Sequence, residues 1–71
     1  MGDTFYRIKF EGLSEEYFFH NHEDAVAFLL EAYFDDYDVD SEEEVIAINN
    51  EVADTNMIES YGFIDELWFE K

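Results

Sequence analysis

Carboxylates that could bind a metal ion crowd one stretch of the chain. Seven Asp and Glu residues fall within the ten positions from Asp35 to Glu44. Counted from Asp36, aspartates occupy the first, third and fifth positions, which is how a calcium-binding EF-hand loop begins. The sixth position is Ser41, where that loop needs glycine, and the twelfth is Ala47, where it needs a bidentate glutamate. The stretch therefore predicts a solvated anionic surface rather than a specific calcium site.

A second possible metal-binding group consists of His20 and His22, which lie next to Glu23 and Asp24. A structural zinc site needs four ligands, drawn mainly from cysteine and histidine. The chain has no cysteine and no third histidine, so the sequence favours contacts at a strand-to-helix junction over a metal site. We expect no metal and no cofactor.

Catalytic groups are equally hard to assemble from this sequence. Without cysteine there is no thiolate nucleophile, and Ser14, Ser41 and Ser60 lie in no nucleophile elbow. Two carboxylates can serve as an acid and a base, but acidic residues are so frequent here that no pair stands out. The sequence therefore indicates a protein that is not an enzyme.

The net charge points to a partner. Twenty Asp and Glu residues oppose three Lys and Arg residues, which gives a formal net charge of −17. Charge of one sign at this density opposes compaction, so it indicates a basic binding partner, and large basic surfaces are commonly those that hold nucleic acid. The same charge excludes direct nucleic-acid binding, and with it a use of the aromatic residues as a platform for stacked bases.

The composition nevertheless predicts a folded chain. Acidic disordered segments are poor in aromatic residues, whereas this chain is 48% hydrophobic and 20% aromatic. At 71 residues it should form one domain spanning residues 1–71, with a radius of gyration of about 11 Å.

The first half of the chain has the pattern of a β-hairpin followed by a helix. From Thr4 to Phe10, the even-numbered residues are mainly apolar and the odd-numbered ones include Arg7 and Lys9, which is the alternation of a half-buried strand. Gly12 suits a turn with positive φ. Glu15 to His20 would be the second strand. Asn21 is a credible N-cap for a helix from Glu23 to about Phe34, where apolar residues recur at helical spacing.

The second half is read as a helix and a strand. Ser41 followed by Glu44 has the spacing of a capping box, which predicts a helix from Glu42 to about Ala53. The β-branched run from Val45 to Ile48 leaves a strand open as the alternative. Asp54 to Gly62 should be mostly connection, and Phe63 to Glu70 alternates as a third strand.

These elements predict an α+β fold of order ββααβ, in which a β-hairpin and the C-terminal strand form a small antiparallel sheet covered by one or two helices. We expect Phe63, Leu67 and Phe69 to share the apolar face of the third strand. A central first strand would then place Arg7 and Lys9 beside Glu66 and Glu70 on the exposed face, where the bases are neutralised.

The acidic residues of the connections and of the second helix form the predicted partner-binding surface. Carboxylates along a helix and its preceding loop can imitate phosphates, which lie about 1.7 Å apart along the axis of duplex DNA. Tyr37, which lies between two aspartates, and Tyr61, which follows Glu59 by two residues, are candidate aromatic anchors, although Tyr61 could equally belong to the core. The predicted site comprises Asp35, Asp36, Tyr37, Asp38, Asp40, Glu42, Glu43, Glu44, Glu51, Asp54 and Glu59.

With its small size, overall acidity, lack of cysteine and acidic run from Asp35 to Glu44, the chain resembles the small acidic DNA mimics that phages encode against host defence. These are anti-CRISPR proteins, anti-restriction proteins and uracil-DNA glycosylase inhibitors. The resemblance implies an inhibitor that binds a basic nucleic-acid-binding protein, first of all a CRISPR effector, in the cytoplasm of a bacterial host.

Other classes remain open. A housekeeping domain of a halophile, an acidic adaptor or chaperone for a basic protein, and a cation-binding protein would share this composition. The longest apolar run, from Ala25 to Leu30, is too short for a membrane span, so we expect no membrane association.

Overall fold

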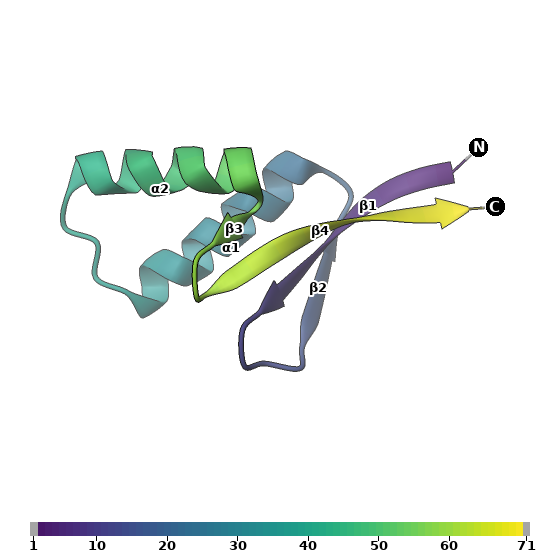
Figure 1. Ribbon diagram of the computed structural model, residues 1–71, viewed down its shortest axis with the longest axis horizontal. Coiled ribbons are helices and arrows are strands. Elements are labelled where there is room, and N and C mark those ends of the chain that lie inside the picture. The colour runs from purple at the N-terminus through teal and green to yellow at the C-terminus, as the bar shows by residue number, and fades with distance from the viewer. Residues whose placement is uncertain (1, 71) are drawn as a thin grey trace.

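The computed structural model describes residues 2–70, and the side chains of residues 4–68. It has six elements: β1 (Gly2–Phe10), β2 (Glu16–Phe19), α1 (His22–Asp36), α2 (Glu42–Thr55), β3 (Met57–Ile58) and β4 (Gly62–Glu70). The predicted α+β fold of order ββααβ is confirmed, with the two-residue β3 as an additional strand. Both helices lie to one side of a four-stranded antiparallel sheet (Figure 1).

The sheet has the strand order β2-β1-β4-β3, so the first strand lies centrally, as expected. β1 and β4 pair along their full lengths, from Gly2 opposite Glu70 to Phe10 opposite Gly62. The hairpin turn between β1 and β2 contains Gly12 at a φ of 84°, the conformation predicted for it.

The N-cap residues of both helices are those that the sequence predicts, although α1 begins at His22, one residue before the expected Glu23, and both helices end two residues later than expected. Asn21 is the N-cap residue of α1, but its side chain makes no capping bond, and its Nδ2 instead donates to Asp24 Oδ2 at 3.1 Å. Ser41 is the N-cap of α2, and its Oγ accepts a hydrogen bond from the Glu44 amide at 3.4 Å. The residues from Val45 to Ile48 are therefore helical, and the alternative of a strand is wrong.

The core lies between the sheet and α1. Its buried residues are almost all aliphatic; they are Ile8, Phe10, Ala25, Val26, Leu29, Leu30, Val52, Ile58 and Ile64. Half-buried aromatic residues such as Tyr6, Phe28 and Tyr33 pack around this core rather than inside it. α2 contributes only Val52 to these buried residues, so most of the surface of α2 is exposed to solvent.

The expected faces of the last strand are wrong. Ile64 lies opposite Ile8 and is buried, whereas Phe63 faces away from the helices and is 41% exposed. Arg7 consequently lies beside Asp65, not Glu66. The cause is that apolar residues occur at both odd and even positions of β4, so alternation alone did not identify the buried face. The sequence also predicts a face for the side chains of Phe69 and Glu70, but these two side chains lie outside the part of the chain whose side chains are described.

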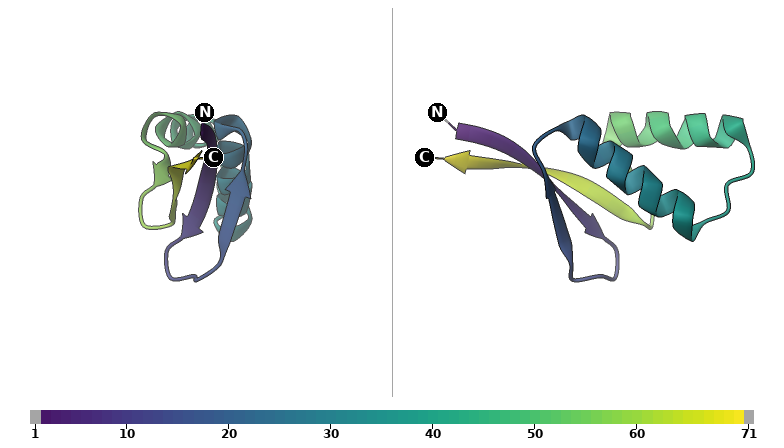
Figure 2. Two further views of the ribbon diagram at one scale, coloured as in Figure 1. Left: turned by 90° about the vertical axis from the view of Figure 1, so that its right-hand side faces the viewer. Right: turned by 180° about the vertical axis from the view of Figure 1, so that it is seen from behind.

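The molecule is elongated, with principal extents of 45 × 24 × 15 Å and a radius of gyration of 12.8 Å. This exceeds the expected value of about 11 Å for a compact chain of this length. The excess comes from the outer halves of β1 and β4, which project beyond the helices (Figures 1 and 2). Trp68 lies on this projection and is 72% exposed.

Candidate functional site

The acidic run forms the end of the molecule opposite the projecting strands (Figure 1). Asp35 and Asp36 end α1, Asp38 and Asp40 lie in the following loop, and Glu42–Glu44 form the first turn of α2. All seven carboxylates are exposed. The structure therefore brings this part of the predicted site together on one surface, which we call the acidic end.

Two further predicted residues continue the acidic end along α2. At about 3.6 residues per turn, Glu51 and Asp54 fall on the same side of the helix as Glu43 and Glu44. Both are exposed, and this side lies away from the buried Val52. Glu59 is exposed in the turn between β3 and β4 and belongs to a different segment of the chain.

The two candidate anchors, Tyr37 and Tyr61, lie together. The Tyr37 ring stacks on Tyr33 with 4.7 Å between centroids, and Tyr61 meets Tyr33 edge-on at 5.2 Å. The Tyr61 hydroxyl donates to Asp36 Oδ2 at 2.6 Å, which joins the β3–β4 turn to the end of α1. Tyr37 is 48% exposed whereas Tyr61 is half-buried, so Tyr37 is the better placed to meet a partner.

The electrostatics of Tyr61 follow from this packing. Burial disfavours a charged phenolate, and the nearby Asp36 carboxylate accepts the hydroxyl proton, so both raise the pKa of Tyr61. The phenol stays protonated at neutral pH and keeps its hydrogen bond to Asp36.

A pocket of about 350 Å³ opens beside these tyrosines. It is bounded by the β1–β2 turn, the end of α1 and the β3–β4 turn, and its walls combine rings with carboxylates: Phe10, Tyr17, Tyr37 and Tyr61 with Glu11 and Asp36. Aromatic rings and carboxylates together suit the cationic side chain of Arg or Lys. Sequence reasoning missed Glu11 and Tyr17, because no local pattern shows that the hairpin reaches the end of α1.

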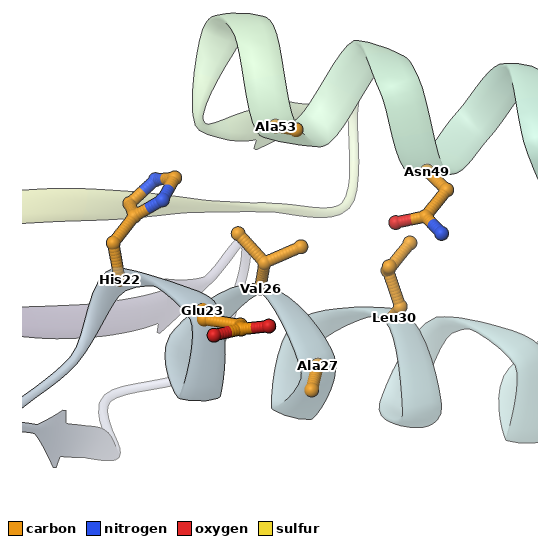
Figure 3. Close-up of a pocket in the computed structure, with 7 residues that line it drawn as sticks. All are labelled: His22, Glu23, Val26, Ala27, Leu30, Asn49 and Ala53. Carbon is orange, nitrogen blue, oxygen red and sulfur yellow. The ribbon is translucent and has the colours of Figure 1, made fainter.

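A groove of about 390 Å³ between α1 and α2 is mainly apolar. Figure 3 shows Val26 and Leu30 of α1 directed toward Ala53 and Asn49 of α2. His22 lies at one end of this groove.

The contacts of His22 are those of a junction residue. Its Nε2 contacts Asn56 Oδ1, and its ring meets Tyr6 edge-on at 5.3 Å. Among the described residues, no three His, Asp or Glu side chains converge as possible metal ligands.

The described bases lie away from the acidic end. Arg7 Nη2 donates to Asp65 Oδ2 at 2.8 Å and Nη1 to Glu16 Oε1 at 3.2 Å. The hydrogen bond that Arg7 donates to Asp65 is the main reason that the pKa of Arg7 is raised. Lys9 is half-buried on the same side of β1, the side that no helix covers. The two described bases therefore share the uncovered side of the sheet with Glu16 and Asp65.

Neither helix in the described part of the chain combines the length and the apolar character needed to cross a membrane. Comparison with known proteins found no matching protein family, no matching curated protein and no matching solved structure.

Proposed function

We propose that the protein binds a basic nucleic-acid-binding protein and excludes its nucleic acid, with carboxylates taking the place of phosphates. The observation that carries this proposal is the acidic end, where seven exposed carboxylates gather on one surface. A basic surface that holds DNA would gain charge-assisted hydrogen bonds and release counterions on binding this surface, as it does on binding phosphates.

The spacing of the carboxylates supports phosphate mimicry. Along α2, the four acids Glu43, Glu44, Glu51 and Asp54 cover about 16 Å at a rise of about 1.5 Å per residue. These four charges are therefore about 5.5 Å apart on average along the helix axis, which is wider than the rise of about 3.4 Å between phosphates of one DNA strand but of the same order. A rigid helix therefore presents a row of negative charges whose average spacing is of the same order as that of a phosphate backbone.

The positions of several acids oppose stability, which also favours a binding role. Asp35 and Asp36 lie in the last turn of α1 and Asp54 near the end of α2, and neither last turn contains a base. A helix C-terminus carries partial negative charge, so acids there are unfavourable by about 0.3 to 1 kcal/mol each at exposed positions. Residues that break a local rule in this way are expected at functional sites.

The pocket beside Tyr37 supplies a place for one specific contact. Long-range attraction among many charges mainly accelerates association, whereas a buried contact slows dissociation. An Arg or Lys side chain of the partner would stack on the rings and bind Glu11 and Asp36. Within the class of phage-encoded mimics we place anti-CRISPR activity first, because guide and target strands occupy broad basic channels in such effectors. Anti-restriction activity and DNA-glycosylase inhibition are the alternatives.

The test is competition for labelled duplex DNA, with purified CRISPR effectors, restriction enzymes and a uracil-DNA glycosylase as targets. One variant changes Asp38, Asp40, Glu42 and Glu43 to Asn or Gln, and it spares Asp36 because Tyr61 depends on that carboxylate. A matched control changes Glu23, Asp24, Glu31 and Glu66, which are exposed elsewhere, by the same total charge.

We expect the protein to inhibit DNA binding by one of these targets. The acidic-end variant should lose at least about tenfold in affinity, and the control should lose much less, because only the first set faces the partner. Equal losses would show that net charge alone acts and would remove the acidic end from the interface. Reproducible binding of labelled DNA by the isolated protein would contradict the proposal that its carboxylates take the place of phosphates.

A further inference from the structure

The side of the sheet that the helices leave uncovered carries large apolar residues. Strand alternation and register place the following side chains together on it, and we call this surface the open face: Phe5, Arg7, Lys9, Glu16, Phe18, Met57, Phe63, Asp65 and Leu67. Phe18 is 57% exposed, Met57 42% and Phe63 41%. The rings of Phe5 and Phe18 lie 5.9 Å apart, so they form one apolar patch across β1 and β2.

The open face is electrically balanced in a protein of net charge −17. Its described side chains include two bases, Arg7 and Lys9, and two acids, Glu16 and Asp65. Both acids are bound by the Arg7 guanidinium. The exposed acids of the helices and connections lie elsewhere, so the open face is the described surface where another acidic molecule meets the least repulsion.

We propose that a second copy of the chain binds on the open face, so that the protein forms a symmetric dimer with the two sheets face to face. A basic partner would be drawn to the acidic end rather than to a neutral surface. A second copy brings the same apolar patch and the same mixture of charges, and a twofold axis lets each base of one copy approach an acid of the other. This inference does not depend on the proposed function.

The size of the open face predicts a weak dimer. With strands about 4.8 Å apart and a rise of about 3.3 Å per residue, the nine residues each of β1 and β4 and the short β2 and β3 cover roughly 400 Å². Stable interfaces bury about 800 Å² on each partner. The dimer should therefore dissociate in the micromolar range or above.

The dependence on salt concentration distinguishes formation of this dimer from binding of a basic target. Two copies of charge −17 repel each other outside the contact, so screening should strengthen self-association. Binding of a basic target is an attraction between opposite charges and should weaken under the same change. The two activities have opposite salt dependence and can fail independently.

The experiment is sedimentation equilibrium of the wild-type chain at about 0.05 M and about 0.5 M NaCl. We expect a monomer–dimer equilibrium whose dissociation constant falls by about tenfold or more at the higher salt concentration. Phe18→Asp should raise this constant by at least about tenfold, because it places a charge in the apolar patch. Trp68→Asp is the matched control: it adds the same charge at a residue that is 72% exposed on the other side of the sheet, and it should leave the constant nearly unchanged.

A second variant keeps the proposal testable if Phe18→Asp unfolds, as judged by circular dichroism. Phe63→Asp changes the inner strand β4, where it should weaken a face-to-face dimer but not one formed through strand edges. Dimers insensitive to Phe63→Asp would overturn the proposal. So would a chain that stays monomeric at about 1 mM in both salts, or equal effects of Phe18→Asp and Trp68→Asp.

Discussion

Tyr61 connects three parts of the molecule through one side chain. Its hydroxyl binds Asp36 at the end of α1, and its ring meets Phe10 of β1 at 5.3 Å and Tyr37 at 5.6 Å. Its own backbone carbonyl accepts from the Glu11 amide at 2.8 Å. The pocket beside Tyr37 therefore has a wall that is fixed from several directions.

The raised pKa of Tyr61 predicts how stability depends on alkaline pH. A phenol whose pKa is higher in the folded than in the unfolded state adds stability that is complete below the unfolded value of about 10. That contribution is lost as pH rises through the folded value. In a spectrophotometric titration of phenolate absorbance, Tyr61→Phe should remove the step that occurs at the highest pH.

Tyr17→Phe is the control for this titration, because the pKa of Tyr17 is also raised, chiefly by its hydrogen bond to Glu15. At neutral pH, Tyr61→Phe should lower the free energy of unfolding by about 1 kcal/mol, the net value of a typical intramolecular hydrogen bond. A wild-type titration without a late step would contradict the role of burial at Tyr61.

At the scale of elements, the sequence predicted those parts whose local patterns agree with their environment. α1 has an apolar stripe and a plausible N-cap, and α2 has the Ser41–Glu44 pair, so both helices could be placed. β3 could not be, because two residues are too few to show a period. Its existence depends on pairing with β4, which positions Met57 opposite Phe63.

The same reason limited prediction of the site. The acidic end follows from consecutive residues and was found, whereas the pocket beside Tyr37 unites residues from three distant segments. The buried face of β4 also depends on a contact between residues that are far apart in the sequence. Pairing with Ile8 places Ile64 on the side of the sheet that faces the helices.

Gly62, at the start of β4, should be intolerant of a side chain. A Cβ there would lie 3.1 Å from Leu29 Cδ1, 3.1 Å from the Lys9 carbonyl oxygen and 3.2 Å from Phe10 Cδ1. The backbone oxygen belongs to a central strand and the other two atoms to the core, so relief requires movement of the packed layers. We expect Gly62→Ala to lower the free energy of unfolding by about 1 to 3 kcal/mol in a denaturant titration.

Gly12→Asn is the comparison for Gly62→Ala. Gly12 has a φ of 84°, but no atom lies within 4 Å of its added Cβ, and asparagine tolerates left-handed backbone. Gly12→Asn should lower the free energy of unfolding by about 1 kcal/mol or less. A Gly62→Ala protein as stable as wild type would mean that the α1–sheet packing yields more easily than its close contacts indicate.

For the whole molecule, repulsion among unpaired carboxylates should dominate the response to salt. Arg7 binds two of the described acids, while the acidic end contains no described base. The melting temperature should therefore rise between about 0.02 M and about 0.5 M NaCl, measured in dilute solution so that dimerisation does not contribute.

The acidic-end variant should show a smaller salt dependence than wild type, because it has four fewer charges to screen. A melting temperature that falls with salt would mean that the ion pairs of Arg7 outweigh this repulsion. A protein folded only above about 1 M salt would instead favour the halophilic housekeeping domain.

The pairing of β1 with β4 joins the first and last strands of the chain, and it governs when the protein can fold. On the ribosome, β1 emerges before β4 and until then has only β2 as a strand partner, and a two-stranded hairpin is marginal in water. The central pair of the sheet closes only after β4 has left the exit tunnel. A chain whose synthesis stops before Gly62 would lack the strand that pairs with Ile8 and Phe10, and it would be a ready substrate for cellular proteases.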